Sequence, residues 1–237
     1  MSESALIVGV GDGLSASLAR LFRSEGMRVM LAARNTEKLT ALAEHTEAAT
    51  VACDAADPAS VEAMFAEADA TIGTPDVVVF NPSARVRGPV TEIDQAGVRN
   101  ALLVTCYGGF LVTQLAAQRM LPRGSGSILL TGASASVKGF ANSSSFAMGK
   151  FGLRGLAQAT ARELAPRGIH VAHFVIDGGI RDGDARRAVM SACHQTLSPR
   201  VICTSTSSIA AHGPGRLNCD PGSKSSNADA SGPDLQR

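Results

Sequence analysis

Strand-length apolar runs recur along the first three quarters of this chain, and their repetition constrains the fold more than any other feature. Within each run Val, Ile, Leu and Ala tend to follow one another instead of alternating with polar residues, so both faces of each strand should be buried. The runs are Ala5–Val8, Arg28–Ala32, Thr50–Cys53, Val77–Phe80, Ile128–Thr131 and His170–Ile176. This order predicts a parallel sheet between two layers of helices.

The segments between the runs carry the signals of amphipathic helices. Asp57 and Pro58 supply an N-cap and a first-turn proline, while Pro122 and Gly168 stand where two other helices should end. Four apolar residues repeat on one face of the first helix: Leu14, Leu18, Leu21 and Phe22. Strands and helices that alternate in this way predict a doubly wound α/β fold, the three-layer αβα Rossmann fold, as a single domain over residues 1–181.

The character of the chain changes after Arg181. Ser, Gly, Pro, Asn and Asp dominate residues 204–237, and no convincing final strand or helix is visible there. We therefore expect residues 182–237 to form a divergent, largely disordered tail and the sheet to lack its last strand. One hypothesis for the abrupt change is a reading-frame shift near Asp182, which translation of the coding DNA in the other two frames would test.

Charge and composition disfavour several classes of partner. The 22 basic and 21 acidic residues leave a net charge of +1 without a basic block, which argues against nucleic acid and anionic membranes. The N-terminus lacks the basic start of a signal peptide, and no apolar run approaches the ~20 residues that span a bilayer. A cytoplasmic protein without a membrane partner is expected.

The cysteines and histidines do not predict a metal site. The five cysteines are odd in number and lack C-x-x-C spacing, so we expect reduced thiols rather than disulfides or a zinc site. His170 and His173 lie on a predicted strand without an acidic or cysteine partner nearby, so they are interpreted as packed residues rather than metal ligands.

A glycine-rich loop, Gly9 to Ser15, follows the first strand and opens the first helix. The N–H groups of such a loop and of the helix N-terminus can face a pyrophosphate, although a turn that serves only the reversal from strand to helix is an alternative. Arg34 follows the second strand, where an acidic residue favours NAD and a guanidinium favours the 2′-phosphate of NADP. Arg34 therefore indicates NADP, with NAD less favoured. A solvated strand-end charge is the alternative.

Residues 5–181 resemble the short-chain dehydrogenase/reductase family, because several motifs occur in the family's order and at its spacings. Gly9 and Gly13 resemble the family's G-x-x-x-G-x-G loop, with Ser15 in place of the last glycine, where its side chain is expected to crowd the packing. Phe80-Asn81-Pro82-Ser83 stands where the family has Asn-Asn-Ala-Gly, and the segment Phe146 to Lys150 resembles Tyr-x-x-x-Lys. The resemblance implies a dinucleotide-binding fold and a small-molecule carbonyl or alcohol substrate.

The resemblance implies cofactor contacts at the positions that match these motifs. Asp54 would contact the adenine amino group, and Asn81 would lie near the cofactor as well as stabilise the sheet. A capping or turn role for Asp54 and a purely structural role for Asn81 are the alternatives. The implied NADP contacts are Gly9, Gly11, Asp12, Gly13, Leu14, Arg34, Asp54, Ala55, Asn81, Lys150, Gly178 and Ile180.

The resemblance also implies four catalytic positions, and three of them are changed. Active members use a tyrosine as general acid and base, a lysine that lowers its pKa and holds the ribose, a serine that holds the substrate oxygen, and an asparagine in a proton relay. Lys150 is retained, with an exposed helix lysine as the alternative interpretation. Phe146 stands at the tyrosine position, Ala133 at the serine position and Thr105 at the asparagine position.

No other residue is an evident replacement for the lost groups. Tyr107 is the only tyrosine of the chain, and the residue four positions later is Leu111. Ser134 would replace the serine only if a local bulge brought it into the place of Ala133. Carbonyl reduction by the usual route should therefore be very slow.

Two functional hypotheses follow. The first is an NADP(H)-binding oxidoreductase with weak or atypical activity on an unidentified carbonyl or alcohol. The second is a non-catalytic NADP(H)-binding pseudoenzyme that acts as a sensor or partner subunit. In both, the resemblance implies a homodimer or homotetramer formed through the helices over residues 108–121 and 145–165.

Overall fold

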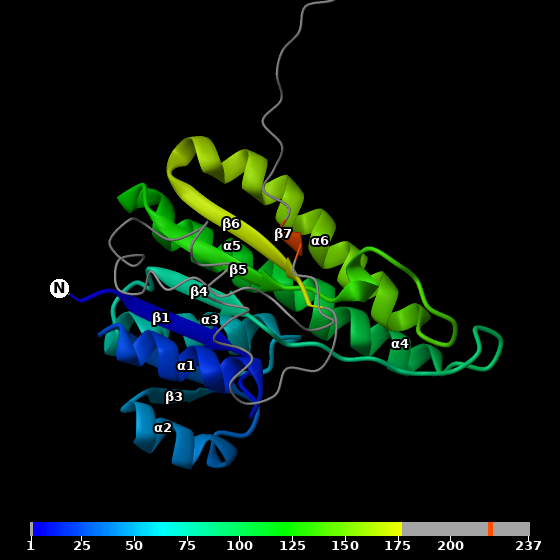
Figure 1. Cartoon of the computed structure of the whole chain (residues 1–237), viewed down its shortest axis with the longest axis horizontal. Helices are drawn as coiled ribbons and strands as arrows, with labels where there is room; N and C mark the ends of the chain where they lie inside the picture. The colour runs from blue at the N-terminus through cyan, green and yellow to red at the C-terminus, as the bar shows by residue number, and fades with distance from the viewer. Residues whose placement is uncertain (1, 177–217, 220–237) are drawn as a thin grey trace, which may run out of the picture.

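Seven strands form one sheet in the computed structural model, which describes residues 2–176 and 218–219 (Figure 1). The order across the sheet is β3-β2-β1-β4-β5-β6-β7, and the first six strands all pair in parallel. Their bounds are Ser4–Val8 for β1, Arg28–Ala33 for β2, Ala49–Ala52 for β3, Val77–Phe80 for β4, Gly126–Thr131 for β5, Ile169–Val175 for β6 and Asn218–Cys219 for β7. The doubly wound parallel sheet predicted from the sequence is confirmed.

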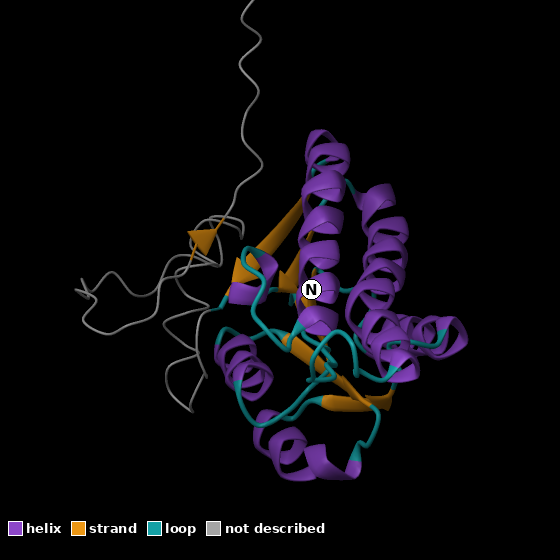
Figure 2. Ribbon diagram, turned by 90° about the vertical axis from the view of Figure 1, so that its right-hand side faces the viewer, coloured by secondary structure: helices purple, strands orange, loops and turns teal. Residues whose placement is uncertain are grey.

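Helices cover both faces of this sheet (Figure 2). The six α-helices of the described residues are α1 at Leu14–Ser24, α2 at Thr40–Thr46, α3 at Pro58–Thr71, α4 at Gln95–Leu102, α5 at Gly108–Met120 and α6 at Ser144–Leu164. Short 3-10 turns lie at Glu37–Leu39, Leu121–Arg123, Ser134–Ser136 and Ala165–Arg167, and a π-helical segment at Leu103–Tyr107 joins α4 to α5.

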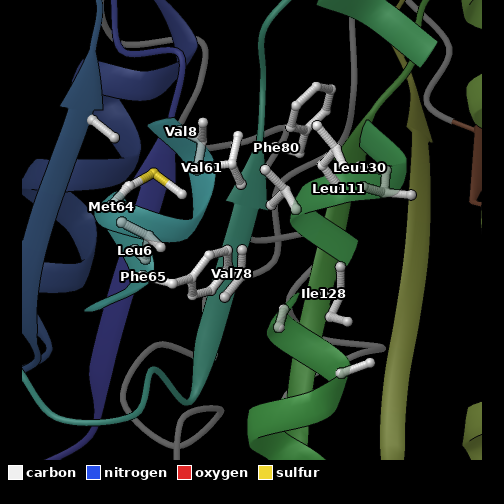
Figure 3. Close-up of a cluster of buried hydrophobic side chains, with 14 of the residues drawn as sticks. Leu6, Val8, Val61, Met64, Phe65, Val78, Phe80, Leu111, Ile128 and Leu130 are labelled. Carbon is white, nitrogen blue, oxygen red and sulfur yellow. The ribbon is translucent and has the colours of Figure 1, made fainter. Parts of the chain in front are cut away.

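Two apolar clusters hold the layers together, and successive residues of β1 belong to different clusters. Leu6 and Val8 face α3, α5 and α6, whereas Ala5 and Ile7 face α1. The residues labelled in the close-up of the first cluster are Leu6, Val8, Val78, Phe80, Ile128 and Leu130 from the strands, with Val61, Met64, Phe65 and Leu111 from α3 and α5 (Figure 3). Burial on both faces explains why the strands read as continuous apolar runs.

The predicted helix ends are found in the structure. The Asp57 carboxylate accepts a hydrogen bond from the Ala59 N–H at 3.1 Å, and Pro58 is the first residue of α3. Pro122 lies in the 3-10 turn that ends α5, and Gly168 follows the turn after α6 with a left-handed φ of 80°. On α1, Leu18, Leu21 and Phe22 are buried as predicted, and Leu14 is half-buried.

Beside the parallel strands the structure has one short strand that the sequence analysis did not predict. Asn218 and Cys219 form β7, which pairs antiparallel with Val175 and Phe174 of β6. The edge of β6 has backbone N–H and C=O groups available for pairing. A strand of two residues is too short to show an apolar pattern, so the sequence did not predict it. The remaining residues predicted to be disordered, together with Gly178 and Ile180, lie outside the described residues.

One helical stretch differs from expectation in its hydropathy. From Gln95 to Arg123 the chain is continuously helical, with a mean hydropathy of 1.3 over its most apolar window, so its length and composition would allow it to cross a membrane. The stretch is not a continuous apolar run, because scattered Thr, Gln and Gly residues interrupt it, so it was not recognised from the sequence. Half of that window is buried inside the protein, where Leu111, Val112 and Met120 belong to the apolar core, as is usual for a core helix.

Candidate functional site

A cleft of about 490 Å³ opens where the chain reverses its direction across the sheet, at the carboxyl ends of β1 and β4. In doubly wound sheets this is the place where ligands bind. Seven of the predicted cofactor residues line the cleft: Gly9, Gly11, Asp12, Arg34, Asp54, Ala55 and Asn81. Gly13, Leu14 and Lys150 do not line it. Lys38, Pro82, Ser83 and Asn100 line it without having been predicted.

Gly9 must be a glycine for two separate reasons. Its φ is 79°, in the left-handed region, and a Cβ atom built there would lie 2.6 Å from the backbone nitrogen of Pro82. Its N–H and that of Val10 both donate to the Ala32 carbonyl, at 2.9 and 3.1 Å. The loop after β1 is therefore fixed to the end of β2, and the pyrophosphate would meet the amides that follow, at the start of α1.

Ser15 fits into its position without crowding, contrary to expectation. The side chain is buried, and its hydroxyl donates to the Gly9 carbonyl at 3.2 Å and accepts from the Asn81 side-chain amide at 2.8 Å. The Asn81 N–H donates to the Val8 carbonyl at 3.0 Å. Ser15 thus bridges the glycine loop to the end of β4, and Asn81 combines a structural role with a place in the cleft wall.

Two basic side chains stand at the end of the cleft that follows β2. Arg34 is exposed, and Lys38 lines both this cleft and an adjoining one of about 450 Å³ beside α1 and α2. Neither side chain makes an ion pair with a carboxylate of the described residues. An arginine and a lysine with no local anion can receive a phosphate group.

Asp54 has a turn role as well as a place in the cleft. Its carboxylate accepts from the Ala56 N–H at 3.0 Å, and its own N–H donates to the Ser60 hydroxyl at 2.9 Å. The neighbouring Cys53 is buried, and this burial raises the pKa of its thiol to about 11. Asp54 is thus held in a fixed turn at the mouth of the cleft.

Lys150 is buried in α6, only 3% exposed, so the alternative of an exposed helix lysine is wrong. Its Nζ donates to the Thr131 carbonyl at 2.7 Å and lies 5.8 Å from the centroid of the Phe146 ring. Burial lowers the pKa of this amine from 10.5 to about 8. At neutral pH the ammonium form is retained, held by a single carbonyl at the end of β5.

Phe146 is half-buried on the first turns of α6, and two cations contact its ring. Besides Lys150, the guanidinium carbon of Arg85 lies 5.2 Å from the ring centroid. The ring has no proton to donate. Arg85 was not among the predicted site residues, because only the folded loop after β4 brings it to α6.

The serine position offers no hydroxyl of its own. Ala133 has an extended backbone, and its N–H donates to the Ser136 hydroxyl at 3.1 Å. A 3-10 turn begins at Ser134, whose N–H donates to the Ile176 carbonyl at 3.0 Å. The chain therefore turns after Ala133 without the bulge that would have placed Ser134 there.

The Thr105 side chain holds the loop after β4 in place. It is fully buried in the π-helical segment, and its hydroxyl accepts from the Ala84 N–H at 3.0 Å and donates to the Ala84 carbonyl at 3.4 Å. Ser145 of α6 holds Val86 in the same way, at 3.0 and 2.8 Å. Sequence reasoning did not identify Ser145, although a serine directly before the tyrosine position was a visible signal.

The histidines of β6 are packed residues, as predicted. His173 is buried against Gly132, where a Cβ atom would lie 2.3 Å from the imidazole, and burial lowers the pKa of His170. Within residues 2–176 and 218–219, no group of three His, Cys, Asp or Glu side chains is arranged to hold a metal ion.

Comparison with known proteins extends these observations. A protein of Sinomonas cyclohexanicum, trans-4-hydroxycyclohexanecarboxylate dehydrogenase, is 32% identical over 178 residues that cover 70% of this chain and 68% of the relative. A variant of actinorhodin polyketide ketoreductase with NADPH superposes with a TM-score of 0.70 at 28% identity, over 73% of this chain and 69% of that one. The chain spans about two thirds of the length of the curated relatives it matches.

A second solved structure, a short-chain dehydrogenase from Rhodopseudomonas palustris, superposes with a TM-score of 0.75 at 33% identity, over 89% of this chain and 99% of that one. The family model described as short chain dehydrogenase matches residues 3–191. With the parallel sheet, the glycine loop and the lysine of α6 in place, the protein belongs to the short-chain dehydrogenase family.

Proposed function

We propose that the protein binds NADP(H) in the cleft at the ends of β1 and β4 and acts as a weak oxidoreductase on a small carbonyl or alcohol. The observation that carries the proposal is the nucleotide side of the cleft, where a close-packed glycine meets two basic side chains that make no ion pair within the described residues. Gly9 leaves room that a side chain would fill, so the loop can approach a pyrophosphate closely.

Each part of the nucleotide has a matching group in the chain. The amides that open α1 would hold the pyrophosphate, and Arg34 with Lys38 would hold the 2′-phosphate. Asp54 would accept from the adenine amino group, and the Lys150 ammonium would donate to the nicotinamide ribose. The cofactor supplies the hydride chemistry. A related structure with NADPH supports the preference for the phosphorylated dinucleotide.

The site lacks the side chains that would transfer a proton to the substrate. The loss of the acid at Phe146 removes a factor of about 10²–10⁴ in rate. The loss of a donor at Ala133 removes a further factor of about 10²–10³. Water would then supply the proton, and Lys150 would hold its positive charge near the reacting oxygen at pH values below about 8.

A non-catalytic NADP(H)-binding protein is the second candidate. It is favoured because two of the three changed catalytic positions have structural contacts instead. Thr105 holds the loop after β4, and Phe146 packs against Arg85. Steady NADPH oxidation with any compound of a carbonyl panel, lost in Lys150→Ala, would contradict this second candidate. The panel should include 4-oxocyclohexanecarboxylate, since a relative acts on the corresponding alcohol.

Titration of NADPH and NADH, followed by nucleotide fluorescence, tests the cofactor assignment. We expect NADPH to bind more tightly, and Arg34→Leu to weaken NADPH by roughly tenfold while NADH is unaffected, because a charged hydrogen bond contributes about 1.5–3 kcal/mol. Arg167→Gln is the matched control, at the opposite, amino-terminal end of the strands. Equal or tighter binding of NADH would contradict the role of Arg34.

Self-association and location complete the proposal. Tyr107, Phe110, Met148 and Phe151 expose large apolar surfaces on the long helix and on α6. A homodimer or homotetramer that buries this face would remove them from water, and sedimentation of Phe151→Glu beside the native chain tests it. Reduced Cys53 and Cys106 fit the cytoplasm, which we propose as the location.

A further inference from the structure

Two loops meet beside Phe146, and hydrogen bonds fix them to each other and to α6. The loop after β4 runs along the loop that precedes α6, because the Gly88 N–H donates to the Asn142 carbonyl at 3.2 Å. Ser145 holds Val86 through both of its backbone groups. The side chains that these loops carry are therefore presented at a defined place next to the tyrosine position.

These loops are positively charged. Residues 83–88 and 137–143 contain Arg85, Arg87 and Lys138 and no acidic residue; Glu92 and Asp94 follow later in the first loop, and the Asp94 carboxylate is used as the N-cap of α4. All three side chains are exposed, and none makes an ion pair with a carboxylate of the residues that the structure describes. With Lys150 behind the ring, this end of the site holds several cations that make no ion pair within the part of the chain that the structure describes.

Arg85 is the best placed of these groups. Its guanidinium carbon lies 5.2 Å from the centroid of the Phe146 ring, so the ring positions it at the catalytic end of the site. A cation–π contact uses the charge of a guanidinium and leaves its N–H donors available. A guanidinium with available donors is matched by a carboxylate, which it can bind through two parallel hydrogen bonds.

We propose that the substrate of this site carries a carboxylate and that Arg85 binds it, so that the protein acts on short oxo or hydroxy acids. The proposal rests on the function proposed above and adds its substrate class. In the reductive direction the carbonyl carbon accepts a hydride from NADPH, forming the new C–H bond. The carbonyl π electrons move to the oxygen, which takes a proton from water and leaves hydroxide, so the products are the hydroxy acid, hydroxide and NADP⁺.

Binding of two matched probes tests the proposal without relying on turnover. The affinities of 4-oxocyclohexanecarboxylate and of its uncharged methyl ester would be measured by calorimetry on the full chain, with and without saturating NADPH. We expect the carboxylate to bind at least tenfold more tightly than the ester. Arg85→Gln should abolish that difference and leave the affinities of the ester and of NADPH unchanged, and Arg85→Lys should retain part of it.

Arg87→Gln is the matched control, because it removes the same charge from the same loop two residues away. It should reduce carboxylate affinity by less than threefold. Equal binding of acid and ester by the native chain, or an equal loss in the Arg85 and Arg87 variants, would overturn the proposal. Because NADPH binding is measured separately, a failure of the cofactor assignment would be recognised independently of the acid–ester comparison.

Discussion

The two sides of the cleft differ in how many of the family's functional residues they retain. On the side of β1, β2 and β3, the glycine loop, Arg34 and Asp54 line the cleft in which we propose that the nucleotide binds. On the side of β4, β5 and α6, only Lys150 remains of the four groups that move protons or hold the substrate oxygen. Nucleotide binding depends largely on backbone positions and strand order, whereas proton transfer depends on a few side-chain atoms. The second can be lost while the first is kept.

Lys150 lies on the altered side, on α6, and its burial is costly. A pKa lowered from 10.5 to about 8 corresponds to roughly 3 kcal/mol of destabilisation in the folded state at neutral pH. The chain retains this lysine although the tyrosine whose pKa such a lysine would lower is gone. A nucleotide ribose is the ligand that would account for its retention.

The largest predicted effect restores chemistry on the altered side. The double variant Phe146→Tyr with Ala133→Ser should raise the rate of NADPH oxidation with 4-oxocyclohexanecarboxylate by roughly 10⁴–10⁷-fold, because it restores both the acid and the oxygen donor. Steady-state kinetics measure this change. Tyr107→Phe is the control and should change nothing, since Tyr107 is exposed on the far side of the π-helical segment from the buried Thr105. An unchanged rate in the double variant would mean that the substrate side no longer accepts a carbonyl.

The second effect concerns stability and pH. Between pH 8 and 10.5 the unfolded chain holds a proton on Lys150 that the folded chain has released, so the free energy of unfolding should rise with pH. The rise totals roughly 3 kcal/mol relative to Lys150→Met. Urea unfolding of both proteins across this range measures it. Cys53, whose raised pKa has the opposite effect between pH 9 and 11, cancels because both proteins contain it. If the difference in unfolding free energy between the two proteins does not change with pH, the pKa of Lys150 is not lowered by burial.

The smallest effect tests the bridge on the nucleotide side. Ser15→Ala removes a hydroxyl that donates to Gly9 and accepts from Asn81, so it should lower the free energy of unfolding by about 1–2 kcal/mol. Ser17→Ala is the matched control on the same helix, because its hydroxyl is buried without a hydrogen-bond partner in the structure. It should be neutral or slightly stabilising. Similar losses in the two variants would show that Ser15 acts by packing alone.

The sequence revealed the sheet because each strand lies between two helix layers and reads as an unbroken apolar run. The glycine loop and Arg34 were also visible, since their positions follow directly from the strand ends. Arg85 and Ser145 were not, because their roles arise when two distant loops meet. The crowding expected of Ser15 was wrong for the same reason, as Asn81, its partner, comes from another strand.

The hydroxyl of Thr105 limits the order in which an active enzyme could be rebuilt from this chain. An asparagine placed there would have to remake both bonds to Ala84 with a longer side chain, and it would need more space in a fully buried site, close to Gly149, where a Cβ atom would lie 3.0 Å from that of Thr105. Phe146→Tyr has no such obstacle. Phe146→Tyr would therefore have to come first. Thr105→Asn could follow only after another side chain holds the loop after β4, so the substitutions that restore activity have a required order.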